Sequence, residues 1–230
     1  MALAMYDLAG ADDRHRFSPY CWRTRMACAH KGLALDTIAW RFTEKDKLPH
    51  PNTGTVPVLV DGERVVADSW KIAAYLDQRY PNRPLFDSAG ARAEALLIKY
   101  WTERTLHPLV MRMAACDIWR ALHPEDQAYF RESREKRLGA KLEDVTADRE
   151  QTRARFRQAL EPLRAMLADQ PYICGASPAY GDYIVFGMFM WARCASPFEP
   201  LEPSDSVHAW RQRLLDLHGG LAARAPAYPL

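Results

Sequence analysis

Residues 55–69 read Thr-Val-Pro-Val-Leu-Val-Asp-Gly-Glu-Arg-Val-Val-Ala-Asp-Ser, and this stretch decides the fold. Two short apolar runs, 58–60 and 65–67, flank Asp61-Gly62, a dipeptide that tolerates the positive φ angles of a tight hairpin turn. The Asp-Ser pair that ends the stretch supplies N-cap chemistry for a run with helical spacing. The stretch therefore predicts a β-hairpin that leads directly into a helix.

The chain before this hairpin alternates β-type and helical runs. Residues 6–8 predict a first strand, residues 19–31 predict a helix with Gly32 at its C-terminal cap, and residues 37–42 predict a second strand. Such alternation is typical of a mixed α/β unit, which we expect over residues 1–83.

The pattern changes after the hairpin and its helix. Pro81 and Pro84 interrupt helical structure, and the β-type runs cease beyond Ser88. Helices are expected over 91–119, 125–169, 180–195 and 206–217, with kinks in the longest. In the third of these, residues at helical spacing form one face that we assign to the core: Tyr183, Phe186, Gly187, Met190 and Trp191. The predicted fold class is α/β plus all-α, with a linker over 84–90 and a helical domain over 91–230.

The composition is that of an ordinary globular protein, with 48% hydrophobic and 26% charged residues. The 31 basic and 29 acidic residues give a net charge of +2, which argues against a nucleic-acid partner. Five cysteines lack paired spacing and no His cluster has zinc-ligand spacing, so we expect reduced thiols and no metal. The most apolar late stretch, 183–192, is too short to span a membrane, and we expect a cytoplasmic protein.

Residues 17–25 read Phe-Ser-Pro-Tyr-Cys-Trp-Arg-Thr-Arg and cross from a loop into the first helix. Ser18 lies at the N-terminus of that helix, where exposed N–H groups and the helix dipole favour an anion. A bound thiolate is such an anion. The alternative is that Ser18 is an ordinary N-cap and Pro19 the usual first helical residue.

Residues 18–21, Ser-Pro-Tyr-Cys, resemble the Cys-Pro-Tyr-Cys site of glutaredoxins with its first cysteine replaced by serine. Residues 22–25 resemble the first helix of serine- and cysteine-type glutathione transferases. Residues 129–135 and 139–144 resemble the second domain of bacterial glutathione-dependent β-aryl etherases and of fungal etherase-like transferases. This resemblance implies a thioredoxin-like first domain that binds glutathione.

The resemblance also assigns roles around the hairpin. It implies that Pro57 is cis and that the backbone of Val56 pairs with the cysteine of glutathione. Ser69 and the N–H groups beside it would hold the γ-glutamyl carboxylate, while Asp68 would take the ammonium, in agreement with the helix dipole. The alternatives are a trans proline that starts a strand and a plain N-cap pair.

The glycine carboxylate of glutathione needs a cation from the segment between the second strand and Val56. The candidates are Arg41, Lys45, Lys47 and His50. We choose Lys47 on its spacing to Val56-Pro57.

The expected function is that of a serine-type glutathione transferase, in which Ser18 stabilises the thiolate for attack on a hydrophobic electrophile. The resemblance suggests aryl ethers as substrates and implies a homodimer. The second substrate should lie between the domains near aromatic residues that could equally belong to the core: Tyr20, Tyr100, Trp101 and Trp119.

Two other functions remain open at this point. One is a non-catalytic protein that binds glutathione and hydrophobic ligands. The other is thiol-transferase or peroxidase chemistry that uses Cys21, although an oxygen at residue 18 should make the redox chemistry weak or absent.

One position departs from the family pattern. Members usually carry Ser, Thr or Asn three residues before the aspartate of the buried helix, here Asp182, but this chain has Ala179. Loss of a side-chain cap would lower stability by about 1 kcal/mol. Asp182 can still accept hydrogen bonds from backbone N–H groups, so the fold is expected to hold.

Overall fold

The computed structural model describes residues 3–49 and 54–229. Its sheet has four strands in the order β2-β1-β3-β4, namely β1 (Leu3–Leu8), β2 (Leu35–Trp40), β3 (Val58–Asp61) and β4 (Arg64–Ala67). β1 pairs in parallel with β2, with Leu3 opposite Leu35, and antiparallel with β3. The parallel pair arises from a helical crossover, and the antiparallel pair β3–β4 is the predicted hairpin.

The hairpin turn differs from the prediction by one residue. Asp61 pairs with Arg64 as the last residue of β3, so the two loop residues are Gly62 and Glu63. Gly62 has a φ of 58°. Glycine at the first loop position supplies the left-handed backbone angle that a two-residue loop requires, and Asp61 does not need it.

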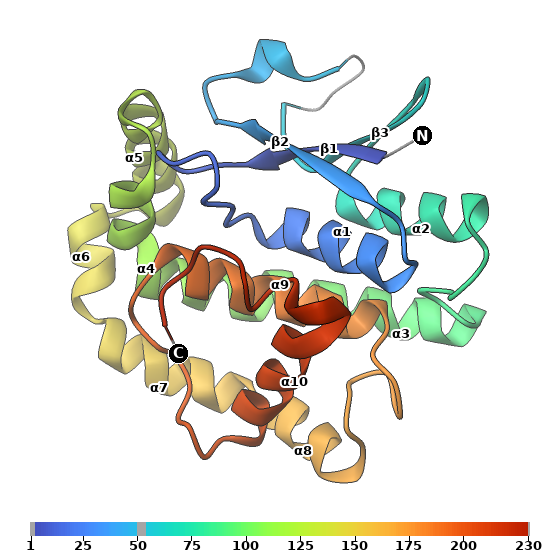
Figure 1. The fold of residues 1–230 in the computed structure, drawn as a ribbon. Helices are drawn as coiled ribbons and strands as arrows, with labels where there is room; N and C mark the ends of the chain where they lie inside the picture. The colour runs from blue at the N-terminus through green and yellow to red at the C-terminus, as the bar shows by residue number, and fades with distance from the viewer. Residues whose placement is uncertain (1–2, 50–53, 230) are drawn as a thin grey trace.

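Helices α1 (Pro19–His30) and α2 (Ser69–Arg79) lie between the sheet and the helical half of the molecule (Figure 1). The 3-10 turn η1 (Lys45–Lys47) follows β2. Gly32 follows α1 with a φ of 70°, as its C-cap assignment predicted. The second strand ends at Trp40, two residues earlier than predicted, because side-chain carboxylates bind the next two N–H groups.

The second half is helical, which confirms the predicted fold class. Its elements are α3 (Ala89–Trp101), a π-helical turn η2 (Thr102–Leu106), α4 (His107–Ala121), α5 (Pro124–Leu138), α6 (Leu142–Ala147), α7 (Arg149–Ala159), α8 (Glu161–Asp169), α9 (Tyr180–Ala195) and α10 (Ser206–Gly220). The described residues contain no helix that is long and apolar enough to cross a membrane.

The stretch 125–169 is helical, as predicted, but the expected kinks are full breaks that divide it into four separate helices. α5 ends at Gly139, which adopts a φ of 70°, and the chain breaks again at Asp148 and Leu160. Glycine in the left-handed region terminates a helix readily. With these breaks the chain turns back toward α4, and both α6 and α7 pack against α4.

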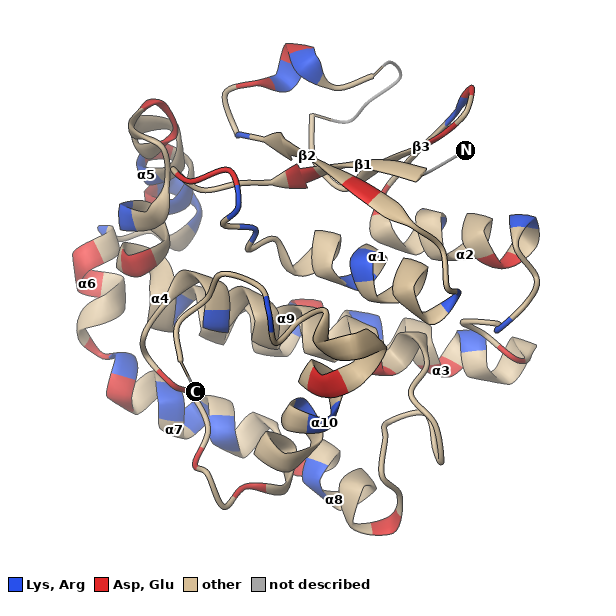
Figure 2. Ribbon diagram, in the orientation of Figure 1, with Lys and Arg blue, Asp and Glu red and all other residues tan. Residues whose placement is uncertain are grey.

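Helix α9 forms the centre of the core, as its apolar face predicted. Every one of its residues except Arg193 is buried, and the helix appears almost uncharged in Figure 2. α9 packs directly against α1. A Cβ at Gly187 would collide with the carbonyl oxygen of Pro19, so glycine permits this close approach. The contact fixes the N-terminus of α1 against the helical half.

Asp182 lies in the first turn of α9 and binds several donors at the start of that helix. Its carboxylate accepts hydrogen bonds from the N–H groups of Ile173 at 2.8 Å and Ala179 at 3.2 Å, and from the Nε1 of Trp210 at 2.9 Å. Burial raises the pKa of Asp182, while these donors oppose that shift. The expectation that Asp182 would bind backbone N–H groups is confirmed.

Candidate functional site

A cavity of about 710 Å³ is lined by residues from both halves of the chain. This volume lies within the range of about 300–1,000 Å³ that small-molecule sites occupy. The N-terminus of α1, the segment before β3, and helices α4, α5 and α9 contribute the wall: Ser18, Pro19, Tyr20, Gly54, Thr55, Val56, His107, Met111, Tyr129, Phe130, Arg134, Arg137 and Trp191 among others. The position suits a ligand held between the two halves.

Ser18 is the N-cap of α1 and lines the cavity. Its Oγ accepts a hydrogen bond from the N–H of Cys21 at 3.2 Å, and the residue is only 3% exposed. Because the hydroxyl accepts this bond, its own O–H remains able to donate elsewhere. The N-cap interpretation is confirmed, and it is compatible with a donor role toward a ligand.

Cys21 lies one helical turn further and is fully buried. Burial raises the pKa of its thiol well above the ordinary value, and the charge of Asp7 adds to that effect. A thiol in this environment forms little thiolate, which is the reactive species in disulfide exchange. The structure therefore gives Cys21 the character of a core residue.

The bond between Val56 and Pro57 is cis, and Val56 lines the cavity. The carbonyl oxygen of Pro57 accepts a hydrogen bond from the N–H of Asp68 at 3.2 Å. This contact joins the start of the hairpin to the start of α2. The two segments that the resemblance assigns to glutathione are therefore adjacent in the structure.

Asp68 caps α2, and Ser69 is the first residue of that helix. The Asp68 carboxylate accepts from the N–H groups of Trp70 and Lys71, both at 3.0 Å. Asp68 has a φ of 81°, a conformation that is unfavourable for a residue other than glycine and that recurs at ligand sites. Within the described residues the N–H of Ser69 has no hydrogen-bond partner. Neither Asp68 nor Ser69 is part of the described cavity wall, and Ser69 is buried.

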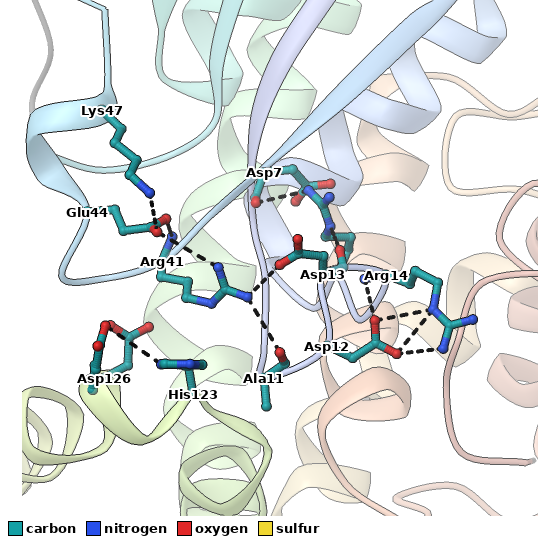
Figure 3. A network of polar contacts seen from close by, with 12 residues as sticks. Asp7, Ala11, Asp12, Asp13, Arg14, Arg41, Glu44, Lys47, His123 and Asp126 are labelled. Atoms are coloured by element: carbon teal, nitrogen blue, oxygen red, sulfur yellow. Dashed lines mark hydrogen bonds and ion pairs between the residues drawn. The ribbon is translucent and has the colours of Figure 1, made fainter.

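Lys47 does not line the cavity. Its ammonium binds the Oε1 of Glu44 at 2.6 Å, and its side chain is 61% exposed. Figure 3 shows this pair within a network in which Arg41 contacts Asp13 and Glu44. Lys45 lies on the cavity wall instead, with its Nζ 5.1 Å from the ring of Tyr129. His50, the remaining candidate, lies outside the described residues.

Of the four aromatic residues predicted for the second substrate, Tyr20 lines the cavity. Tyr100 is 45% exposed on α3, and Trp101 packs against the core. Trp119 lies under the guanidinium of Arg131 at 4.6 Å. None of these three belongs to the described cavity wall. Burial of Tyr20 raises the pKa of its hydroxyl, so it stays protonated at neutral pH.

Sequence reasoning missed the contribution of α5. Phe130, Arg134 and Arg137 all line the cavity. They are spaced at i, i+4 and i+7, which places them along one face of a helix. This spacing could have indicated a shared helix face, but the segment carries so many charges of both signs that it resembles an ordinary solvent-exposed helix.

His107 was also missed, and it is the first residue of α4 after the π-helical turn. It is 8% exposed, and its ring meets those of Tyr20 and Trp191 edge-on at 5.5 and 5.6 Å. Burial, helped by the charge of Arg23, lowers the pKa of His107 to about 3. Its Nε2 is buried without a partner among the described atoms. A neutral imidazole in the cavity wall can therefore donate or accept one further hydrogen bond.

A buried ion pair supports this part of the cavity. Arg23 of α1 is fully buried, and its Nη1 binds the Oε1 of Glu103 in η2 at 2.7 Å. Glu103 also binds Lys99 at 3.0 Å. π-helical turns are often found at functional sites. Here the turn directs Glu103 toward α1 and joins the two halves beside His107.

Comparisons with known proteins agree with this architecture. The family model for the glutathione S-transferase C-terminal domain matches residues 94–225, and the one for the N-terminal domain matches residues 14–84. A stringent starvation protein A homolog of Pasteurella multocida is 31% identical over 96 residues, 40% of this chain and 45% of that protein. Glutathione S-transferase Z1 of Arabidopsis thaliana is 41% identical over 68 residues, 27% of this chain and 31% of that protein. The chain thus spans less than half the length of these curated relatives.

Solved structures share the fold over nearly the whole chain. Glutathione transferase GSTFuA3 of Phanerochaete chrysosporium superposes with a TM-score of 0.81 at 23% identity, covering 93% of this chain and 96% of that one. A glutathione S-transferase of Ceriporiopsis subvermispora, solved in complex with glutathione, gives a TM-score of 0.79 at 21% identity and covers 95% and 97%. Because a family model matches more than half of its length, the chain belongs to the glutathione S-transferase family.

Proposed function

We propose that this protein is a serine-type glutathione transferase, in which the Ser18 hydroxyl donates a hydrogen bond to the thiolate of bound glutathione. The observation that carries the proposal is the placement of Ser18, at a helix N-terminus and on the wall of the cavity. Residues 1–83 would bind glutathione and residues 91–230 would supply the hydrophobic wall for the second substrate. The homodimer that the resemblance implies belongs to the same proposal.

The proposed pose of glutathione runs from the segment before β3 to the start of α2, which a backbone hydrogen bond joins. The backbone of Val56 pairs with the cysteine residue, and Pro57 holds that backbone at the cavity wall. The free N–H of Ser69 and the positive end of α2 receive the γ-glutamyl carboxylate, and Asp68 receives the ammonium. Lys45, which lines the cavity, receives the glycine carboxylate in place of Lys47.

In this scheme the residues of α1 favour the ionised form of the sulfur. A free thiol has a pKa of about 8.5, and a helix N-terminus with a hydrogen-bond donor lowers it. The thiol proton passes to solvent. The sulfur then forms a bond to an electrophilic carbon of the second substrate, and the leaving group departs with the bonding electron pair. Ser18 donates its hydrogen bond throughout and is not acylated.

The alternatives are a carrier without turnover and a thiol transferase that uses Cys21. The buried thiol of Cys21 disfavours the second. Formation of a conjugate from glutathione and a model aryl halide distinguishes an enzyme from a carrier. Among substrates, aryl ethers are favoured by the resemblance to etherase-like transferases, and product identification decides between ether cleavage and halide displacement.

The test compares Ser18→Ala with Ser88→Ala. Both serines cap a helix, and the Ser88 Oγ accepts from the N–H of Ala91 at 3.0 Å, but only Ser18 lines the described cavity. Each variant loses a cap worth about 1 kcal/mol. We expect Ser18→Ala to lose the ultraviolet absorbance of bound thiolate and to reduce kcat about 100-fold, while Ser88→Ala keeps both. Equal activity in the two variants would remove Ser18 from the mechanism.

A further inference from the structure

The α5 side of the cavity carries two positive charges without a carboxylate partner. Arg134 and Arg137 both line the cavity, and neither forms an ion pair within the described part of the chain. Arg131, one turn earlier on the same helix, binds Glu135 and Glu143, each at 2.8 Å. Among the basic residues of α5 (Figure 2), Arg131 is therefore paired with carboxylates outside the cavity, whereas Arg134 and Arg137 on the cavity wall have no carboxylate partner among the described residues.

Arg134 is the less exposed of the two. Its Nη1 binds the Oγ of Ser133 at 2.9 Å, but its Nε is buried with no partner among the described atoms. Burial lowers the pKa of Arg134, and the positive charge of Arg137 lowers it further. The half-buried guanidinium of Arg134, beside a second positive charge and without a described carboxylate partner, therefore lowers the stability of the unliganded protein. Such an arrangement is typical of a site that binds an anion.

Aromatic rings surround these guanidinium groups. The Cζ of Arg134 lies 4.8 Å from the ring of Phe130 and 5.5 Å from that of Phe42. The Phe42 ring in turn lies 5.9 Å from Tyr129 and 6.1 Å from Phe130. All three rings border the cavity. The wall therefore offers ring faces and edges next to positive charge, which suits a flat aromatic molecule with a negative substituent.

The proposed pose of glutathione does not need these arginines. It assigns one carboxylate to the start of α2 and the other to Lys45. Glu103, the acidic residue of the described cavity wall, is already bound to Arg23 and Lys99. Arg134 and Arg137 are thus left facing the space for the second substrate.

We propose that the second substrate is an aromatic electrophile that carries a carboxylate, bound by Arg134 and Arg137 while its ring packs against Phe42, Tyr129 and Phe130. This inference rests on the proposed function and specifies the substrate class of the same cavity. A charged hydrogen bond from an arginine fork fixes the orientation of a carboxylate and so presents the opposite end of the ring to the sulfur.

The experiment uses two electrophiles that differ in charge. Para-chloro-meta-nitrobenzoate and the corresponding benzamide share the ring, the nitro group and the chloride leaving group. Their kcat/KM values with glutathione are each divided by the uncatalysed rate constant. We expect the carboxylate-to-amide ratio to exceed about tenfold in the wild type and to fall about tenfold in Arg134→Gln and Arg137→Gln, mainly through KM. Lys136→Gln removes one charge from an exposed part of α5 outside the described cavity wall and should keep the ratio.

Two results overturn the inference. The first is a ratio near one in the wild type, and the second is a ratio that Arg134→Gln and Arg137→Gln leave intact. If the ratio is intact and these variants bind glutathione more weakly, the arginines hold glutathione instead. Calorimetry with meta-nitrobenzoate, which lacks the leaving group, separates this inference from the proposed function. If neither electrophile reacts, arginine-dependent binding of this ligand still supports the carboxylate site, and its absence overturns the site.

Discussion

Replacement of Asp126 tests whether α5 is held over the cavity by a single carboxylate. Asp126 lies in the first turn of α5 and is fully buried. It accepts hydrogen bonds from the N–H of Phe42 at 3.0 Å, the N–H of Thr43 at 2.9 Å and the Oγ1 of Thr43 at 2.8 Å. These bonds join α5 to the segment after β2, so they fix the wall that Phe42 and Arg134 share.

The magnitude follows from the three bonds. Hydrogen bonds to a charged group contribute about 1.5–3 kcal/mol each when the partner stays buried. Thr43 is exposed and its donors regain water in Asp126→Ala, whereas Phe42 as a residue is only half-exposed. The loss of a favourable charge at a helix N-terminus adds about 0.5 kcal/mol. We therefore expect a decrease of about 2–4 kcal/mol in the free energy of unfolding, or on the order of 10 °C in Tm for a chain of this length.

The assay combines thermal unfolding with steady-state kinetics. Glu125→Ala is the matched control. It removes an acidic residue from the same helical turn, and the Glu125 side chain is 77% exposed. Asp126→Ala should lower Tm and raise KM for the electrophile more than it raises KM for glutathione. A Tm within about 1 °C of the control, with an unchanged KM, would refute the idea that this carboxylate holds α5 in place.

Two further predictions concern the cavity wall. The pKa of His107 is about 3 in the folded state against about 6.5 in the unfolded state. Between these two pH values the unfolded state binds more protons, so the free energy of unfolding falls as pH decreases. His107→Met should remove an acid sensitivity on the order of 4 kcal/mol, measured by unfolding from pH 7 to pH 3, and parallel plots of unfolding free energy against pH for the two proteins would contradict this prediction. Lys45→Ala should weaken glutathione binding about fivefold by calorimetry, whereas Lys47→Ala should not, because of these two lysines only Lys45 lines the described cavity. A larger loss of affinity in Lys47→Ala than in Lys45→Ala would restore the assignment of Lys47.

Much of the fold could be predicted because its signals are local. Gly62 between two apolar runs predicts the hairpin, and Ser18 before Pro19 predicts the start of α1. The periodic apolar face of α9 predicts a buried helix, and that helix is the core. Each of these predictions depends on backbone preference or on the spacing of apolar residues, which are properties of neighbouring residues alone.

The errors arise where distant segments compete with local preference. Residues 125–169 have helical composition throughout, yet the helix breaks at Gly139 and beyond because α6 and α7 must turn back to pack against α4. The second strand ends early because Asp126, 84 residues away from Phe42, binds the N–H of that residue. Gly139 marks the first of these breaks locally, whereas the breaks at Asp148 and Leu160 and the hydrogen bond from the N–H of Phe42 to Asp126 leave no mark in the local pattern.

The sequence by itself determined the order of the elements, the family resemblance and the candidate residues around Ser18, Val56 and Asp68, since caps, turns and periodicity are properties of short segments. Only the tertiary structure decided which side chains share the cavity, bringing in His107, Arg134 and Arg137 and leaving out Tyr100, Trp101 and Trp119. The physical reason is that the helix face that points into the cavity is set by the elements that pack against the opposite face. Those elements lie far away in the sequence.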